Sequence, residues 1–291
     1  MSFFKTLQTS EISQYVVKKK INSGSFATVY LAVRKCRLYA IKKPYKQIST
    51  SSDETRKSLE NEINMLKELK HPNIVKLHDV AIGKDSQIYL VLEYAPYDLA
   101  SMVRDRKNQT KMEHKNWLLQ ISSALSYMHS KKILHGDLKV SNILYIDNAV
   151  KIADFGVSRY ISKQMISTAT TLWYRAPELL LDKKSYGAEI DIWSLGCIAY
   201  ELICDTLLFS ENTEIQMLDK IFSTFGFPST LIAPNLLYLK RMDHHNYEFS
   251  NILRKKCLDE QQIQFLEQFF VYEAEGRITA EKLLRNEYLN T

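Results

Sequence analysis

The chain has 291 residues and a formal net charge of +6, and 45% of its residues are hydrophobic and 25% charged. This composition is ordinary for a globular protein and excludes the collagen-like, low-complexity and disulfide-scaffold classes. The N-terminal stretch lacks the apolar segment of a signal peptide, and the four cysteines show no Cys-x-x-Cys spacing. We therefore expect one intracellular domain with reduced thiols and no direct contact with membrane or nucleic acid.

Three β-strands are predicted at the beginning of the chain, over residues 15–23, 28–33 and 38–43, by runs of β-branched and aromatic residues. The first two strands flank a loop, residues 21–29, in which Gly24 is the single glycine. A glycine in such a loop lets the backbone approach a phosphate closely, because it has no side chain and tolerates positive φ. With one glycine, the loop by itself fits a plain hairpin equally well.

Lys42 ends the apolar run of the third strand, where a lysine is usually a surface residue whose charged end reaches water. A helix is predicted over residues 53–69, because leucine and isoleucine recur there at spacings of three and four. Glu62 adjoins this apolar stripe and can therefore point inward as a partner for Lys42. Considered alone, Glu62 would more often be a solvated helix glutamate.

Two further elements are predicted in the middle of the chain. A buried strand over residues 87–99 runs into a short linker, and a long helix with one apolar face covers residues 111–130. The most apolar helix candidate, over residues 192–203, contains Glu201 and is too short to span a bilayer.

The densest group of polar residues lies within residues 134–156, where L-H-G-D-L-K-V-S-N-I-L is followed by D-F-G. Asp137, Lys139, Asn142 and Asp154 stand there among apolar residues. Carboxylate and amide oxygens are ligands that Mg²⁺ prefers, a carboxylate can accept a hydroxyl proton, and a lysine can neutralise phosphate charge. This set suits phosphoryl transfer, a reaction that needs positioning and charge more than covalent chemistry.

With these residues the chain resembles the eukaryotic protein kinase family, whose catalytic loop and D-F-G motif it matches at every position but Gly136. The run T-L-W-Y-R-A-P-E-L-L-L, residues 171–181, resembles the cyclin-dependent kinase branch. The resemblance covers about residues 13–288. It implies an α+β, bilobed protein kinase fold with a small, mainly β N-lobe carrying one helix over residues 1–95, and a larger, mainly α C-lobe over residues 96–291.

The resemblance also implies the residues that perform the reaction. The aspartate of the catalytic loop takes the proton of the substrate hydroxyl, and the lysine that follows stabilises the γ-phosphate. The strand lysine and the helix glutamate form an ion pair beside the α- and β-phosphates, and a threonine hydrogen-bonds the catalytic loop. These catalytic residues are Asp137, Lys139, Lys42, Glu62 and Thr171, and the implied Mg²⁺ ligands are Asn142 and Asp154.

By the same resemblance, ATP is held by the loop between the first two strands, by the third strand and by the linker between the lobes. Leu92 is the expected gatekeeper, Glu93 and Ala95 offer backbone groups to adenine, and Asp98 lies near the ribose. The full set is Ile21, Asn22, Ser23, Gly24, Ser25, Phe26, Ala27, Thr28, Val29, Ala40, Lys42, Leu92, Glu93, Ala95, Asp98 and Leu144.

Two positions depart from the family pattern in a related way. Gly136 stands where the family has an arginine that grips a phosphorylated residue of the activation segment, the stretch after D-F-G, and Asn61 stands where the branch has a second arginine. Arg159 alone remains of that set. We therefore expect little dependence on activation-segment phosphorylation. The alternative is phosphorylation with other cationic partners at Ser162, Ser167 or Thr168.

The expected function is transfer of the ATP γ-phosphoryl group to protein serine or threonine, with Mg²⁺. Arg175 occupies the position that shapes the substrate groove of proline-directed relatives, although Ala169 and Thr170 replace two valines there. A Ser/Thr-Pro preference, a cyclin partner, a role in cell-cycle or transcription control and a nuclear or cytoplasmic location are implied by the resemblance alone. The alternative is a catalytically weak pseudokinase or scaffold that binds a cyclin-like partner, which the glycine-poor loop and Gly136 favour.

Overall fold

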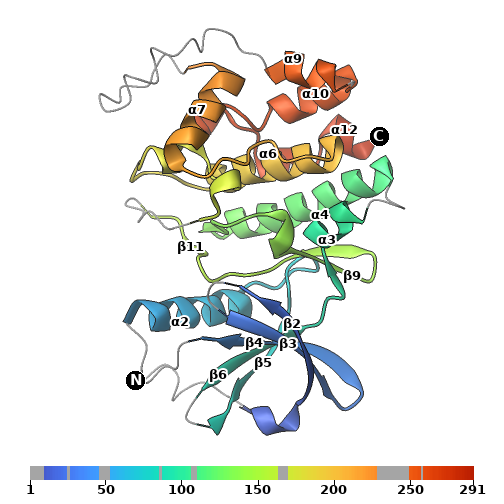
Figure 1. Ribbon diagram of the computed structural model, residues 1–291, viewed down its shortest axis with the longest axis vertical. Helices are drawn as coiled ribbons and strands as arrows, with labels where there is room; N and C mark the ends of the chain where they lie inside the picture. The colour runs from blue at the N-terminus through green and yellow to red at the C-terminus, as the bar shows by residue number, and fades with distance from the viewer. Residues whose placement is uncertain are drawn as a thin grey trace.

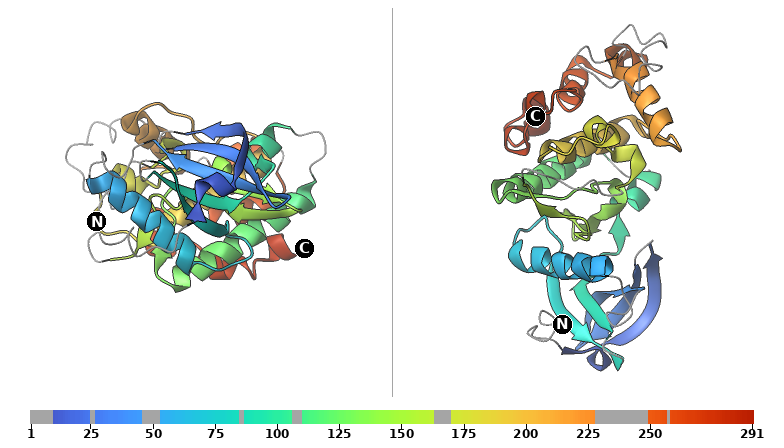
Figure 2. Two further views of the ribbon diagram at one scale, coloured as in Figure 1. Left: turned by 90° about the horizontal axis from the view of Figure 1, so that it is seen from below. Right: turned by 90° about the vertical axis from the view of Figure 1, so that its left-hand side faces the viewer.

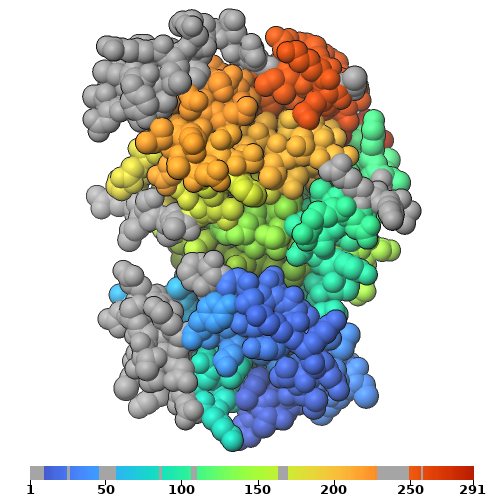
Figure 3. All heavy atoms as spheres, in the orientation of Figure 1, coloured from blue at the N-terminus to red at the C-terminus, as the bar shows by residue number. Residues whose placement is uncertain are grey.

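Two lobes stack along the long axis of the molecule, an N-lobe built mainly of strands and a C-lobe built mainly of helices (Figure 1). In the space-filling view the blue-to-cyan N-lobe lies below the green-to-red C-lobe (Figure 3). The α+β, two-lobed architecture predicted from the sequence is therefore confirmed. The computed structural model describes residues 10–24, 27–45, 53–84, 87–105, 110–162, 170–227, 249–256 and 258–291.

A six-stranded sheet in the order β1-β5-β6-β4-β3-β2 forms the N-lobe. Its pairs are antiparallel except for the parallel pair of β1 and β5. The three strands predicted at the beginning of the chain are present as β2, β3 and β4, with bounds that differ by one residue at most. The strands are β1 (Ser10–Glu11), β2 (Val16–Ser23), β3 (Ala27–Arg34), β4 (Arg37–Pro44), β5 (Leu77–Ile82) and β6 (Ile88–Glu93).

Helix α2 (Asp53–Glu68) lies between this sheet and the C-lobe, as the views in Figures 1 and 2 agree. The predicted apolar stripe of the helix, which includes Ile63, is buried. Burial of each such side chain stabilises the folded state by roughly 1.5–3 kcal/mol. The loop after the helix is tied to the C-lobe, because the N–H of Ile152 donates to the carbonyl of Asn73 at 2.9 Å. The Asn73 amide in turn donates to the carbonyl of Val150, also at 2.9 Å. One end of α2 is therefore fixed to the C-lobe.

Two long helices, α4 (Lys111–Ser130) and α6 (Glu189–Cys204), pack against each other inside the C-lobe. Helix α4 begins and ends at the predicted residues, and Thr110 and Glu113 form a capping box at its start. Helix α6 is buried over nearly its whole length. Among the residues that the structure describes, no helix combines the length and the apolar character that a membrane span requires.

We propose that the lobes divide at residue 95, because β6 ends at Glu93 and the next strand, which pairs within the C-lobe, begins at Tyr97.

Shorter elements complete the described part of the fold. The short strands, which form the sheet β10-β9-β7 and the pair β11-β8, are β7 (Tyr97–Asp98), β8 (Ile133–Leu134), β9 (Ile143–Ile146), β10 (Ala149–Ile152) and β11 (Arg159–Tyr160). The remaining helices are α3 (Leu99–Arg104), α5 (Pro177–Leu180), α7 (Glu214–Phe225), α9 (Phe249–Lys255), α10 (Glu260–Glu267), α11 (Ala280–Leu283) and α12 (Glu287–Asn290). The 3₁₀ turns are η1 (Ile12–Gln14), η4 (Val140–Asn142), η5 (Leu172–Tyr174) and η7 (Ala274–Gly276).

A buried ion pair links α5 to the region near the end of the chain. Arg277 donates to both carboxylate oxygens of Glu178, at 2.6 and 2.7 Å. The guanidinium also donates to the carbonyls of Val271 and Glu189 and lies 5.1 Å from the centre of the Trp193 ring. The pair therefore fixes α5, and α5 directly follows the residues that line the candidate active site.

Candidate active site

A buried carboxylate to which the sequence analysis assigned no role, Asp191, anchors the catalytic loop to helix α6. It accepts the N–H of His135 at 2.8 Å and the N–H of Gly136 at 2.9 Å, and it lies 3.0 Å from Nε2 of His129. Burial opposes the charge of Asp191, but these partners outweigh it and hold its pKa below the usual range. Gly136 has a φ of +83°, which glycine adopts at little cost. The signal in the sequence is an acidic residue near the start of an apolar helix.

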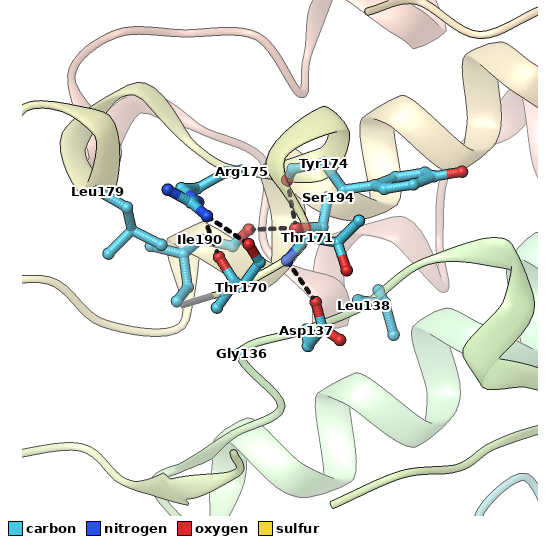
Figure 4. Close-up of a pocket in the computed structure, with 10 residues that line it drawn as sticks. All are labelled: Gly136, Asp137, Leu138, Thr170, Thr171, Tyr174, Arg175, Leu179, Ile190 and Ser194. Carbon is cyan, nitrogen blue, oxygen red and sulfur yellow. Dashed lines mark hydrogen bonds between the residues drawn. The ribbon is translucent and has the colours of Figure 1, made fainter. Parts of the chain in front are cut away.

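The carboxylate of Asp137 is held by two of the predicted catalytic residues. The N–H of Thr171 donates to its Oδ1 at 2.8 Å (Figure 4), and Nζ of Lys139 donates to its Oδ2 at 2.8 Å. Lys139 also donates to the hydroxyl of Thr171 at 2.7 Å, so the predicted contacts of Thr171 with the catalytic loop are present. Burial disfavours the charge of Asp137, yet Lys139 and the Thr171 N–H lower its pKa below the ordinary value. The carboxylate is therefore ionised and oriented at neutral pH.

Lys42 joins the two lobes through two carboxylates. Its Nζ lies 2.6 Å from Oε1 of Glu62 on α2 and 2.8 Å from Oδ1 of Asp154. Burial opposes the charge of Lys42, but the two carboxylates outweigh it and raise its pKa. Burial raises the pKa of Glu62, whereas Lys42 lowers the pKa of Asp154 against the effect of burial. The lysine therefore remains charged, and the predicted ion pair is formed.

Asn142 connects the two groups just described. Its amide nitrogen donates to the carbonyl of Asp137 at 2.9 Å and lies 3.4 Å from Oδ2 of the same residue. The backbone carbonyl of Asn142 accepts the N–H of Ala153 at 2.8 Å, and Ala153 directly precedes Asp154. A chain of short contacts thus runs from Thr171 through the catalytic loop to Lys42.

The predicted metal ligands have the chemistry that Mg²⁺ requires. The amide nitrogen of Asn142 is used within the loop, which leaves the side-chain oxygen as its ligand atom. Asp154 has 46% of its side chain exposed and has a second carboxylate oxygen beyond the one that Lys42 contacts. Within the described ranges no group of three or more His, Cys, Asp or Glu forms a protein cage for a metal. Mg²⁺ is usually bound by one or two carboxylates together with substrate phosphates and water, and the Asp154 carboxylate and the Asn142 amide oxygen suit such a site.

The loop between β2 and β3 is held by a tyrosine that sequence analysis missed. Tyr45, just after β4, donates its hydroxyl to the carbonyl of Gly24 at 2.8 Å and lies 2.7 Å from the hydroxyl of Ser23. Asn22 does not have positive φ, so the loss of a glycine causes no backbone strain at that position. Six predicted loop residues, Ile21, Asn22, Ser23, Ala27, Thr28 and Val29, lie on strands β2 and β3. Ser25 and Phe26 lie outside the described residues.

Four of the residues predicted to contact adenine and ribose are partners of one another on adjacent strands. Ala40 on β4 is the sheet partner of Leu92 on β6, and Asp98 on β7 is the sheet partner of Leu144 on β9. Asp98 also caps α3, because its carboxylate accepts the N–H of Ser101 at 2.7 Å. Ala95 lies in the linker between β6 and β7.

Glu93 uses its side chain to brace the linker between the lobes. Its carboxylate contacts Nζ of Lys151 at 2.8 and 3.1 Å and accepts the N–H of Lys76 at 2.6 Å. The backbone N–H of Glu93 donates to the carbonyl of Lys76 at 3.0 Å. The side chain and the backbone N–H of Glu93 are therefore both engaged within the protein.

A small hollow lies beside Asp137, where a substrate hydroxyl would have to approach (Figure 4). Arg175 on its rim donates to the hydroxyl of Thr170 at 3.1 Å and to the carbonyl of the same residue. Its remaining nitrogen pairs with Glu214 of α7 at 2.5 Å. The hollow is lined by Gly136, Asp137, Leu138, Thr170, Thr171, Tyr174, Arg175, Leu179, Ile190 and Ser194.

Comparisons with known proteins agree with this geometry. The family model described as "Protein kinase domain" matches residues 15–289. The chain is 38% identical to "Probable cyclin-dependent kinase 10" of Dictyostelium discoideum, over 78% of this chain and 65% of the relative, so it spans less than two thirds of that protein. It is 34% identical to "Cyclin-dependent kinase 11" of the same organism, over 92% of this chain and 78% of the relative.

A chain of similar fold is found in a solved structure, "Crystal Structure of the yeast RNA Pol II CTD kinase CTDK-1 complex". The TM-score is 0.84 at 27% sequence identity, and the match covers 98% of this chain and 95% of the other. The family match over nearly the whole sequence, and the relatives above, lead to one conclusion. The chain belongs to the protein kinase family and, within it, to the cyclin-dependent kinase branch.

Proposed function

We propose that the chain is a serine/threonine protein kinase that transfers the γ-phosphoryl group of ATP to a protein hydroxyl. One observation carries the proposal: Lys42 of the N-lobe reaches Asp154 of the C-lobe at 2.8 Å, beside the contacts that hold Asp137. Residues from distant parts of the chain thus meet in the arrangement that phosphoryl transfer requires, in which positioning and charge carry the reaction.

In the proposed mechanism Asp137 orients the substrate hydroxyl and accepts its proton. The low pKa of Asp137 keeps the carboxylate ionised, and Thr171 fixes its direction through the backbone N–H. Lys139 lies within 2.8 Å of this carboxylate and can place its charge on the phosphoryl group that moves. Lys42, held by Glu62, would contact the phosphates that remain with the nucleotide.

Asn142 and Asp154 are the residues that would hold Mg²⁺, through an amide oxygen and a carboxylate oxygen. When bound, the metal supplies positive charge to the phosphate oxygens. Asp154 stands at φ +67°, a backbone conformation that aspartate tolerates better than most residues, and its contact with Lys42 helps to keep it there. The nucleotide would be surrounded by strands β2 and β3 with their loop, and by Ala40, Leu92, Ala95 and Leu144.

The proposed substrate is a protein segment with Ser-Pro or Thr-Pro, and the proposed partner is a cyclin. The hollow beside Asp137 supports the first point, because the charge of Arg175 on its rim is paired with Glu214 and its other nitrogens donate to Thr170, which favours an uncharged substrate residue there. The names of the relatives support the second. The similarity to a kinase of the RNA polymerase II tail supports a role in transcription, beside the cell-cycle role, and a nuclear or cytoplasmic location.

The alternative of a catalytically weak scaffold is less well supported. The residues on which turnover depends are present and in contact, and Gly136 occupies a backbone conformation that suits glycine. The glycine-poor loop, which favoured the scaffold, causes no positive-φ strain at Asn22.

The test is phosphorylation of a synthetic Ser-Pro peptide by the purified chain with ATP and Mg²⁺, alone and with its co-purified partner. Asp137→Asn is the control, and a Ser-Ala peptide tests the proline preference. We expect the partner to raise the activity, Asp137→Asn to abolish it, and the Ser-Ala peptide to react more slowly. Equal rates for the wild-type chain and Asp137→Asn would point to the scaffold.

A further inference from the structure

Helix α2 contacts the start of the activation segment through side chains that donate to backbone carbonyls. Oγ of Ser58 donates to the carbonyl oxygen of Gly156 at 2.9 Å. Nδ2 of Asn61 donates to the carbonyl oxygen of Ser158 at 2.5 Å. We call these two contacts the α2 latch.

The latch joins one face of the helix to the turn that follows Phe155. Ser58 and Asn61 are three residues apart and therefore share one face of α2, while their partners are two residues apart. The partners lie in a turn, in which the N–H of Ser158 donates to the carbonyl of Phe155 at 3.2 Å. A third contact lies further along the same helix, where Glu68 accepts the hydroxyl of Tyr160. Helix and segment are thus matched over about ten residues of the helix.

The latch lies next in sequence to both carboxylates that contact Lys42, those of Glu62 and Asp154. Asn61 precedes Glu62 in the chain, and Gly156 follows Asp154 by two residues. A shift of α2 away from the segment would therefore separate Glu62 from Asp154 and leave Lys42 with one carboxylate.

We propose that Ser58 and Asn61 are positioning residues that keep α2 in its place against the activation segment without a phosphate on that segment. Their donors are a neutral hydroxyl and a neutral amide, and their acceptors are backbone carbonyls. The latch therefore needs no added charge, in agreement with the absence of arginine at positions 61 and 136. The inference rests on the proposed kinase function, and it concerns how that site is regulated.

The first test measures turnover of a Ser-Pro peptide by the full chain with its partner, after phosphatase treatment and a check of intact mass. We expect Asn61→Ala and Ser58→Ala each to lower kcat about fivefold, the loss that one ordinary hydrogen bond predicts, and the double variant to lower it further. The KM for the peptide should change little. Asn64→Ala, at an exposed position of the same helix, is the matched control and should leave kcat unchanged. Ser58→Thr keeps the hydroxyl and should retain most of the activity.

The second test does not depend on turnover. Backbone hydrogen exchange over residues 156–160 should be faster in Asn61→Ala than in Asn64→Ala, because loss of the latch lets the segment open locally. Equal exchange in the two variants would overturn the latch, whether or not the chain proves to be a kinase. A wild-type chain that loses its activity on phosphatase treatment would overturn the phosphate independence while leaving the kinase function intact.

Discussion

Nζ of Lys139 donates to Oδ2 of Asp137 at 2.8 Å, and this contact sets the charge of the proposed catalytic base. Burial alone would raise the pKa of the carboxylate, and Lys139 is the largest of the influences that lower it. Asp137 is therefore ionised in the wild-type chain throughout the neutral and mildly acidic range. Its contribution to stability is present above its unfolded pKa, near 3.8, and is lost as the pH falls through the lower folded value.

We predict that Lys139→Ala moves the acid limb of the kcat/KM profile to higher pH, because burial then acts on Asp137 with less opposition. The measurement is kcat/KM between about pH 4 and pH 8 for both proteins, because ordinary aspartates titrate near the lower end of this interval and desolvated ones titrate within it. Lys183→Ala, which removes an exposed lysine, should keep the wild-type profile. Parallel profiles for Lys139→Ala and the wild type would show that the lysine does not set this pKa.

Much of this site could be predicted from sequence, because its residues lie in short motifs attached to regular elements. The bounds of α4 follow from its apolar periodicity, and the Lys42–Glu62 contact follows from a strand lysine and an inward helix position. The roles of Asp191 and Tyr45 could not be predicted, because they depend on which distant backbone groups each side chain meets. Periodicity records which face of an element is buried, and it does not record those tertiary partners.

Gly136 should resist substitution for a reason that lies in its backbone. Its φ is +83°, where a residue with a Cβ is strained by about 1–2 kcal/mol, and a Cβ there would lie 3.2 Å from Cδ1 of Leu134. We predict that Gly136→Ala lowers the free energy of unfolding by about that amount, measured by urea denaturation. Gly24→Ala is the matched control, because its Cβ would meet no atom within 4 Å and its φ is not positive. Similar losses in both variants would refute the backbone explanation.

Tyr45 should support the binding of phosphates rather than of adenine. Tyr45→Phe removes the hydroxyl that donates to Gly24 and contacts Ser23 in the loop between β2 and β3. We predict that the KM for ATP rises about fivefold, as expected for one lost hydrogen bond, while the Kd of adenosine stays unchanged. Tyr30→Phe on β3 is the control, since no hydrogen bond of the Tyr30 hydroxyl is found among the described residues. A parallel loss of adenosine affinity would indicate a general distortion of the N-lobe.

The Arg277–Glu178 pair tests whether a buried charge pair supports the wall of the substrate hollow. The side chain of Arg277 is fully buried, so Arg277→Met leaves the Glu178 carboxylate without its partner, and we predict a loss of about 3–5 kcal/mol in the free energy of unfolding. The double variant Arg277→Met/Glu178→Leu should lose less than Arg277→Met alone, because no unpaired charge remains inside the protein.

Arg285→Met is the control, because it removes an arginine that is 85% exposed and pairs with Glu281 at 3.9 Å, so its effect on stability should be small. Thermal unfolding of these variants and of the single variant Glu178→Leu measures the differences. Losses of the two single variants that simply add in the double variant would mean that the two charges do not stabilise each other. Since Glu178 directly precedes Leu179 in the lining of the hollow, Arg277→Met should also raise the KM for the peptide substrate.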